Sequence, residues 1–138
     1  MTDMLVRFGP SAGIEAAINA GSLPKGLHMS DTRTLRIRQL NDDFRTTLEG
    51  GKTFLTPGVS SLGPELGIMA LAAVRSFDNF STDNDPYGEH DYGAFTLAGE
   101  KLRWKIDYYD LTMDFGSNDP ADPAQTTRVL TILLAEEW

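Results

Sequence analysis

The chain has no cysteine, and that absence limits both its stabilising chemistry and its location. It can form neither a disulfide nor a thiolate metal site, and proteins without disulfides are typical of a reducing compartment. We therefore expect a cytoplasmic location. No apolar run approaches the roughly 20 residues that cross a bilayer. Asp3, Arg7 and Glu15 interrupt the first 20 residues, so we expect neither a signal peptide nor a membrane partner.

Basic residues are scarce in one part of the chain, which makes the charge strongly uneven. Residues 78–122 contain eleven acids and only Lys101, Arg103 and Lys105 as bases. This one segment therefore carries a charge equal to the net charge of the chain, −8. A surface of this sign repels phosphates, so we expect no direct contact with nucleic acid. An acidic face that only keeps the protein soluble is the simplest interpretation.

Apolar spacing predicts two main helices. Ile37, Leu40, Phe44 and Leu48 recur at three- and four-residue intervals, which predicts a helix over residues 31–48. A second helix is expected to begin at Pro64. Its predicted buried stripe consists of Leu66, Met69, Ala73 and Phe77.

Period-two alternation predicts strands in the second half. Leu102, Trp104, Ile106 and Tyr108 alternate with charged residues, which is typical of a half-buried strand. Residues 92–97 precede it across Ala98-Gly99-Glu100, so we expect an antiparallel hairpin. A short strand is expected over residues 52–56. Residues 129–135 are apolar on both faces and rich in β-branched side chains, which favours a central strand over a helix.

These elements predict an α+β fold, with two helices packed on one face of a small, mainly antiparallel sheet. A chain of 138 residues supports one core. We assign that core to residues 30–138. Residues 1–29 are expected to form an N-terminal appendage, with a short helix capped by Ser11 and a Gly/Pro-containing link.

Three segments also resemble the hallmarks of a known family. They are NDPYGEHD at residues 84–91, WKIDYYD at residues 104–110 and RVLTILLAE at residues 128–136. The family is a bacterial one of unknown function, frequent in plasmid-bearing alphaproteobacteria, and the resemblance covers about residues 30–138. It implies a compact intracellular protein, often encoded on mobile DNA. It implies no established activity or catalytic residue.

The densest set of reactive groups lies in the loop before the hairpin. Asp85, Glu89, His90 and Asp91 could bind a divalent cation, for which Mg²⁺ or Mn²⁺ suits the oxygen-rich set. Their spacing matches no established ligand motif, so our first expectation is no metal and no cofactor. Asn-Asp-Pro and Tyr-Gly are turn chemistry, which favours a structural loop. We expect a neighbouring carboxylate or a backbone carbonyl to hold His90.

Two functions stay open at this level, and whether the chain is an enzyme is undecided. The first is a small binding or inhibitor protein of mobile-element, counter-defence type that engages a basic protein of nucleic-acid metabolism. Its expected contact residues are Asp83, Asp85, Glu89, Asp91, Asp110, Asp119 and Asp122.

The alternative is a metal-dependent or acid–base enzyme, hydrolase-like, centred on the same loop and on residues 104–110. Its candidate catalytic residues are Glu89, His90, Asp107 and Tyr109. Alternation on an exposed sheet face explains Asp107 and Tyr109 equally well. Convergence of the carboxylates in one cleft would favour the enzyme, and their spread over a surface would favour binding.

Overall fold

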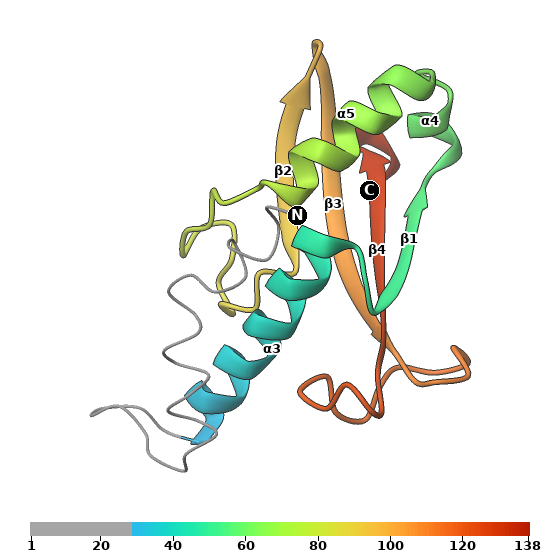
Figure 1. Ribbon diagram of the computed structural model, residues 1–138. Coiled ribbons are helices and arrows are strands. Elements are labelled where there is room, and N and C mark those ends of the chain that lie inside the picture. Colours follow the sequence, from blue (N-terminus) through green and yellow to red (C-terminus); the bar gives the residue numbers. More distant parts are fainter. Residues whose placement is uncertain (1–28) are drawn as a thin grey trace.

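The computed structural model describes residues 29–138, which contain three α-helices and a four-stranded sheet (Figure 1). In chain order the elements are α3 (Met29–Thr47), β1 (Gly51–Leu55), α4 (Pro57–Ser60), α5 (Pro64–Arg75), β2 (Tyr92–Leu97), β3 (Glu100–Tyr109), β4 (Thr127–Leu134) and the 3-10 turn η1 (Ala135–Glu137). The prediction of an α+β fold is confirmed. The predicted appendage over residues 1–29, with its Ser11-capped helix, lies outside the described residues apart from Met29, the first residue of α3.

The sheet has the strand order β1-β4-β3-β2. β2 and β3 form the predicted antiparallel hairpin, with Ala98 and Gly99 at positive φ in its two-residue turn. β4 is antiparallel to β3 and parallel to β1, so the segment predicted as a central strand does lie between two others. An apolar strand in the middle of the sheet buries both of its faces, which explains the uninterrupted apolar run.

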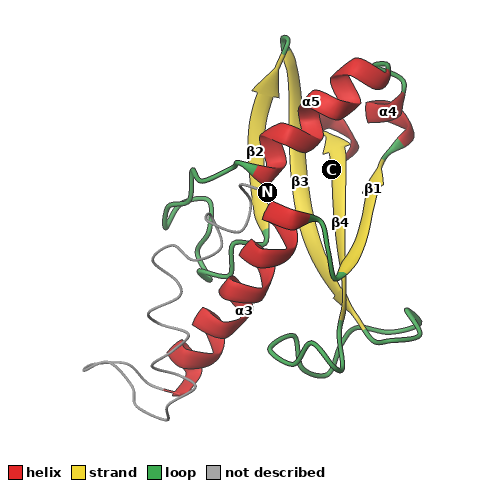
Figure 2. Ribbon diagram, in the orientation of Figure 1, coloured by secondary structure: helices red, strands yellow, loops and turns green. Residues whose placement is uncertain are grey.

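The predicted first helix is confirmed as α3, and it buries Ile37 and Phe44 almost completely. Figure 2 shows α3 and α5 on the near side of the sheet. Phe44 joins the core residues of the sheet, of which Trp104 and Leu130 are fully buried. No helix within residues 29–138 is long and apolar enough to cross a membrane.

The predicted buried stripe of the second helix is correct for Phe77, which packs against the core just after α5, but wrong for Met69. α5 buries Gly67, Ala70 and Val74, whereas Met69 is 49% exposed. A Cβ on Gly67 would lie 3.3 Å from the Leu55 side chain, so the helix packs on the sheet through small side chains. The prediction relied on large apolar residues and therefore placed the wrong side of the helix against the sheet.

Candidate functional site

The loop of residues 78–91 is attached to α3 by a series of polar contacts. Arg38 Nε donates to the Gly88 carbonyl at 2.6 Å, and Asn41 Nδ2 donates to the Glu89 carbonyl at 2.9 Å. Arg45, one helical turn further, donates to the Phe77 carbonyl at 2.8 Å. We call this row of contacts the α3–loop seam. It holds the loop in one shape, because successive turns of a single helix bind both ends of it.

His90 lies between two carboxylates in this seam. Its Nδ1 is 2.9 Å from Asp42 Oδ1, and its Nε2 is 3.6 Å from Asp85 Oδ2. The ring also stacks on Phe80, with the centroids 3.7 Å apart. The expectation that a carboxylate holds His90 is thus borne out, although Asp42 comes from α3 and not from the loop itself. With both ring nitrogens engaged, His90 is part of the scaffold of the loop.

The Glu89 side chain lies at one end of a chain of buried hydrogen bonds that runs through Tyr108 and Asn41 to Arg128. Tyr108 donates its hydroxyl to Glu89 Oε1 at 2.8 Å and accepts from Asn41 Nδ2 at the same distance. Arg128 Nε donates to Asn41 Oδ1 at 2.7 Å. Asn41 is fully buried and Arg128 is 4% exposed. Burial raises the pKa of Tyr108 and lowers that of Arg128, so the phenol stays neutral.

Asp91 has the most unfavourable electrostatic position of the loop carboxylates. Burial raises its pKa, and the neighbouring charge of Glu89 raises it further. Asp85 and Asp107 add to this effect, whereas a backbone hydrogen bond opposes it. A carboxylate that is half-buried among like charges is disfavoured in its ionised form, which is one mark of a functional position.

The candidate catalytic residues do not converge. Asp107 pairs with Lys105 at 3.2 Å on the face of β3 opposite to Tyr108, because neighbouring strand residues point to opposite sides. Tyr109 points the same way as Asp107, beside Thr127 of β4. Glu89 and His90 bind on the core side of the sheet instead. These four residues therefore do not converge in one cleft, as the enzyme hypothesis requires.

The alternative metal set is also divided. Asp85 and His90 are neighbours, but Glu89 is bound to Tyr108. In the described part of the chain, no three carboxylate or imidazole groups lie together so as to hold a metal ion.

A second acidic region follows β3. The segment of residues 110–126, here called the acidic loop, contains Asp110, Asp114, Asp119 and Asp122 and no Lys or Arg. Its carboxylates also build its shape: Asp110 Oδ1 accepts from the Asp114 N–H at 3.1 Å, and Asp122 Oδ1 accepts from the Ala124 N–H at 2.9 Å. Hydrogen bonds from Gln125 and from the Ala124 N–H lower the pKa of Asp122, which keeps it ionised.

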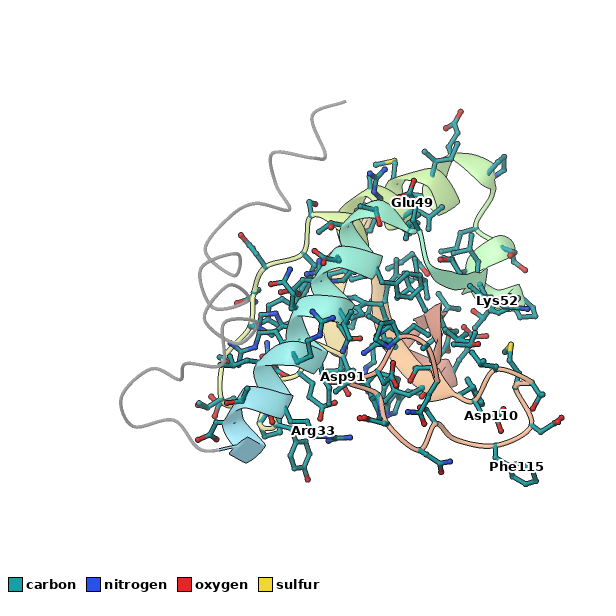
Figure 3. All side chains as sticks on the ribbon, turned by 60° about the horizontal axis from the view of Figure 1, so that its bottom comes forward. Arg33, Glu49, Lys52, Asp91, Asp110 and Phe115 are labelled. Atoms are coloured by element: carbon teal, nitrogen blue, oxygen red, sulfur yellow. The ribbon has the colours of Figure 1, made fainter. Side chains whose placement is uncertain are left out.

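Two large apolar side chains extend from the acidic loop. Leu111 is 65% exposed and Phe115 is 76% exposed. Figure 3 shows Phe115 at the tip of the loop, pointing away from the rest of the molecule, with Asp110 nearby. The Phe115 carbonyl accepts from the Asp110 N–H at 2.8 Å, so the backbone that carries the ring is fixed. An exposed aromatic side chain on a fixed, acidic loop is suited to protein recognition.

The expected contact residues fall into two groups. Asp110, Asp119 and Asp122 lie in the acidic loop, where Asp119 also pairs with Arg33 of α3 at 3.1 Å. Asp83 is exposed in the loop of residues 78–91. The three others point into the α3–loop seam or lie half-buried beside it: Asp85, Glu89 and Asp91.

Several important residues were missed by the sequence analysis. Asn41 and Asp42 were not singled out, although Asn41 falls within the apolar stripe of α3, between Ile37 and Phe44. A polar residue in such a stripe is a signal of a buried hydrogen-bonding role. Phe115 was missed as well. Its signal is a large apolar residue in a segment that otherwise consists of turn-forming and acidic residues.

Comparison with family models gives a match over part of the chain. A family model described as a protein of unknown function (DUF3768) matches residues 55–137, which run from the end of β1 to η1. This range includes both acidic segments and excludes α3. No curated protein and no solved structure matches the chain.

Proposed function

The chain belongs to the DUF3768 family of proteins of unknown function, and we propose that it is a small acidic binding protein whose acidic loop docks on a basic protein partner. The observation that carries this proposal is the exposure of Phe115 and Leu111, 76% and 65%, within a loop that has four carboxylates and no base. Interfaces concentrate their binding energy in a few aromatic anchors, and surrounding charges select the partner and accelerate association.

The partner fits a protein with a positively charged surface around an apolar pocket. Proteins that handle nucleic acids have such surfaces, because their basic residues bind phosphates. An acidic protein that covers this surface would compete with the nucleic acid and act as an inhibitor. The resemblance to a family of mobile DNA is compatible with a counter-defence role of this kind.

The enzyme alternative has weaker support. Glu89 and Asp91 lie close together beside Tyr108, and the raised pKa of Asp91 would suit a general acid. However, Asp107 and Tyr109 belong to the opposite face of the sheet. A hydrolase that uses Mg²⁺ or Mn²⁺ would further need a set of oxygen ligands that residues 29–138 do not bring together.

The binding proposal is tested by capturing partners from a bacterial lysate with the full chain and identifying them by mass spectrometry. We expect a basic protein to be captured, and Phe115→Ala to weaken its affinity about thirtyfold, the effect of losing a central aromatic anchor. Asp114→Asn should mainly slow association, and added salt should have the same effect.

Ile68→Ala is the matched control, because Ile68 is an equally exposed apolar residue, at 68%, on α5. It should bind the captured protein as the unmodified chain does. Capture of a protein that is not basic, or one whose affinity is insensitive to Phe115→Ala, would contradict the proposal.

A further inference from the structure

The sheet has a second face, opposite the core, which we call the outer face. Leu102, Trp104 and Ile106 of β3 point to the core, so the alternate residues Lys101, Arg103 and Lys105 point outward. The register then places Tyr92 of β2 directly beside Lys105. Figures 1 and 2 show α3 and α5 on the other side of the sheet.

The outer face is basic in a strongly acidic protein. Lys52 of β1 lies on the same face as the three basic residues of β3. The register pairs Lys52 with Val129 and Val129 with Asp107, which points outward. Asp107 is the one acid among these strand positions, and Lys105 neutralises it at 3.2 Å. The bases that the sequence places in the acidic segment are therefore all on one face, and the carboxylates of the acidic loop lie beyond the far end of β3.

Aromatic rings accompany these bases. Phe54 of β1 is 51% exposed and shares a row with Thr131, Lys105 and Tyr92 across all four strands. Phe54 and Tyr92 therefore stand three strand spacings apart, about 14 Å. The central side chains of this face include Val129 and Leu133 of β4, which are buried.

Trp138 completes the arrangement. Its ring is 5.0 Å from that of Tyr92, 5.3 Å from the Arg103 guanidinium and 6.0 Å from Lys105 Nζ, measured from the ring centroid. Glu137 fixes the preceding turn by accepting from the Leu134 N–H and from the Thr56 hydroxyl, each at 2.7 Å. Trp138 is nevertheless 58% exposed, so much of its surface faces solvent.

From this arrangement we propose that the outer face binds a single-stranded nucleic acid, with bases stacked on Phe54 and Trp138 and phosphates held by Lys52, Lys101 and Arg103. Exposed aromatic rings interleaved with Lys and Arg are what such strands require, because each base offers a stacking face and each phosphate a charge. An acidic peptide would be attracted by the same basic side chains, but it has no nucleobases to stack on the aromatic rings. A four-stranded sheet of this width accommodates about two or three stacked bases.

The net charge predicts no direct contact with nucleic acid, but charge is divided between surfaces on this chain. At about 0.1 M salt, charges interact over about 10 Å, so a bound strand responds chiefly to the outer face. The long-range repulsion slows association and keeps the affinity in the micromolar range.

The test is fluorescence anisotropy of labelled oligothymidylate and oligouridylate of about ten nucleotides with the full chain. We expect binding to at least one of the two strands at about 50 mM salt, and a tenfold weaker affinity for a duplex of the same length. Phe54→Ala should weaken binding of the strand at least fivefold, whereas Phe54→Tyr, which keeps the ring, should restore it. Lys52→Gln should reduce the salt dependence by about 0.7 in the slope of log K against log salt.

Phe115→Ala serves as the control that separates this site from the acidic loop, and it should leave strand binding unchanged. The proposal is overturned by the absence of binding to both strands at about 100 µM protein, the weak end of non-specific affinities. Equal affinity for the duplex, tighter binding of hexaglutamate, or indifference to Phe54→Ala would each overturn it as well. Unfolding midpoints of all variants show whether a loss comes from the site, and exposed Phe54 should change them little.

Discussion

At the scale of single residues, Asp91 shows a conflict between stability and charge. Its carboxylate is half-buried, and Glu89 and Asp85 add negative potential. Its backbone carbonyl is well placed, since it accepts from the Ile106 N–H at 2.8 Å. The side chain is therefore the unfavourable part of an otherwise well-bonded residue. Conflicts of this kind are often found where a charge serves a function.

We predict that Asp91→Asn stabilises the protein at neutral pH and that the gain disappears in acid. Because the pKa of Asp91 is raised in the folded state, ionisation destabilises the fold as pH rises through that value. The gain should therefore be complete near pH 7 and absent near about pH 3, where both states are protonated. Thermal unfolding of the two proteins at several pH values measures it.

Asp83→Asn is the control for this prediction, because Asp83 is an exposed acid of the same loop. It should change the unfolding midpoint little at any pH. A midpoint of Asp91→Asn that lies below that of the unmodified chain at pH 7 would show that the carboxylate makes a favourable interaction there.

At the scale of elements, patterns of local period were predictable and contacts between distant segments were not. The facing of Trp104 and the Ala98-Gly99 turn follow from residues that are close in the sequence, and both were predicted. The contact face of α5 was wrong because Gly67, Ala70 and Val74 pack by being small, which hydrophobic periodicity does not detect.

The same limit applies to the candidate site. A carboxylate partner for His90 was predictable from the acidic residues around it in the loop of residues 78–91. That Asp42 supplies one was not, since it lies 48 residues away along the chain. The split between Glu89 and Asp107 depends on how the loop of residues 78–91 joins β2, and on which face of β3 each residue reaches. Neither follows from the spacing of acids alone.

We predict that Asn41→Ala destabilises the protein by about 3 kcal/mol. The change removes one hydrogen bond each from the Glu89 carbonyl, the Tyr108 hydroxyl and Arg128 Nε in a buried setting. Each such group costs about 1–3 kcal/mol when its partner is lost, although rearrangement recovers part of the sum. Denaturant unfolding measures the free energy directly.

Arg33→Ala is the matched control on the same helix, because the Arg33–Asp119 pair is exposed and worth at most about 1 kcal/mol. If Asn41→Ala proved no more harmful than this control, the buried hydrogen-bond chain would not be what attaches α3 to the sheet.

At the scale of the whole molecule, the buried hydrophobic cluster of the described residues runs from Phe44 to Ile132. The family match begins later still, at residue 55. α3 nevertheless supplies Asn41, Asp42 and Arg45 to buried contacts, so the folding unit extends beyond the matched range.

We predict that a chain beginning at Met29 folds on its own. It keeps α3, the sheet and the core cluster, and so it should unfold cooperatively. Its oligomeric state should be the same as that of the full chain. Circular dichroism during heating and size-exclusion chromatography provide the measurements. Aggregation, or loss of a cooperative transition, would show that residues 1–28 belong to the core.

The position of β4 has a consequence for how the protein is made. Of the four strands in this sheet, β4 is synthesised last, yet it joins β1 to β3 at the centre of the sheet. Until Thr127–Leu134 leaves the ribosome, β1 and the hairpin of β2 and β3 cannot be joined, and both present unpaired edges. The sheet therefore forms after its translation rather than step by step during it. A nascent chain paused before Thr127 would expose those edges to aggregation.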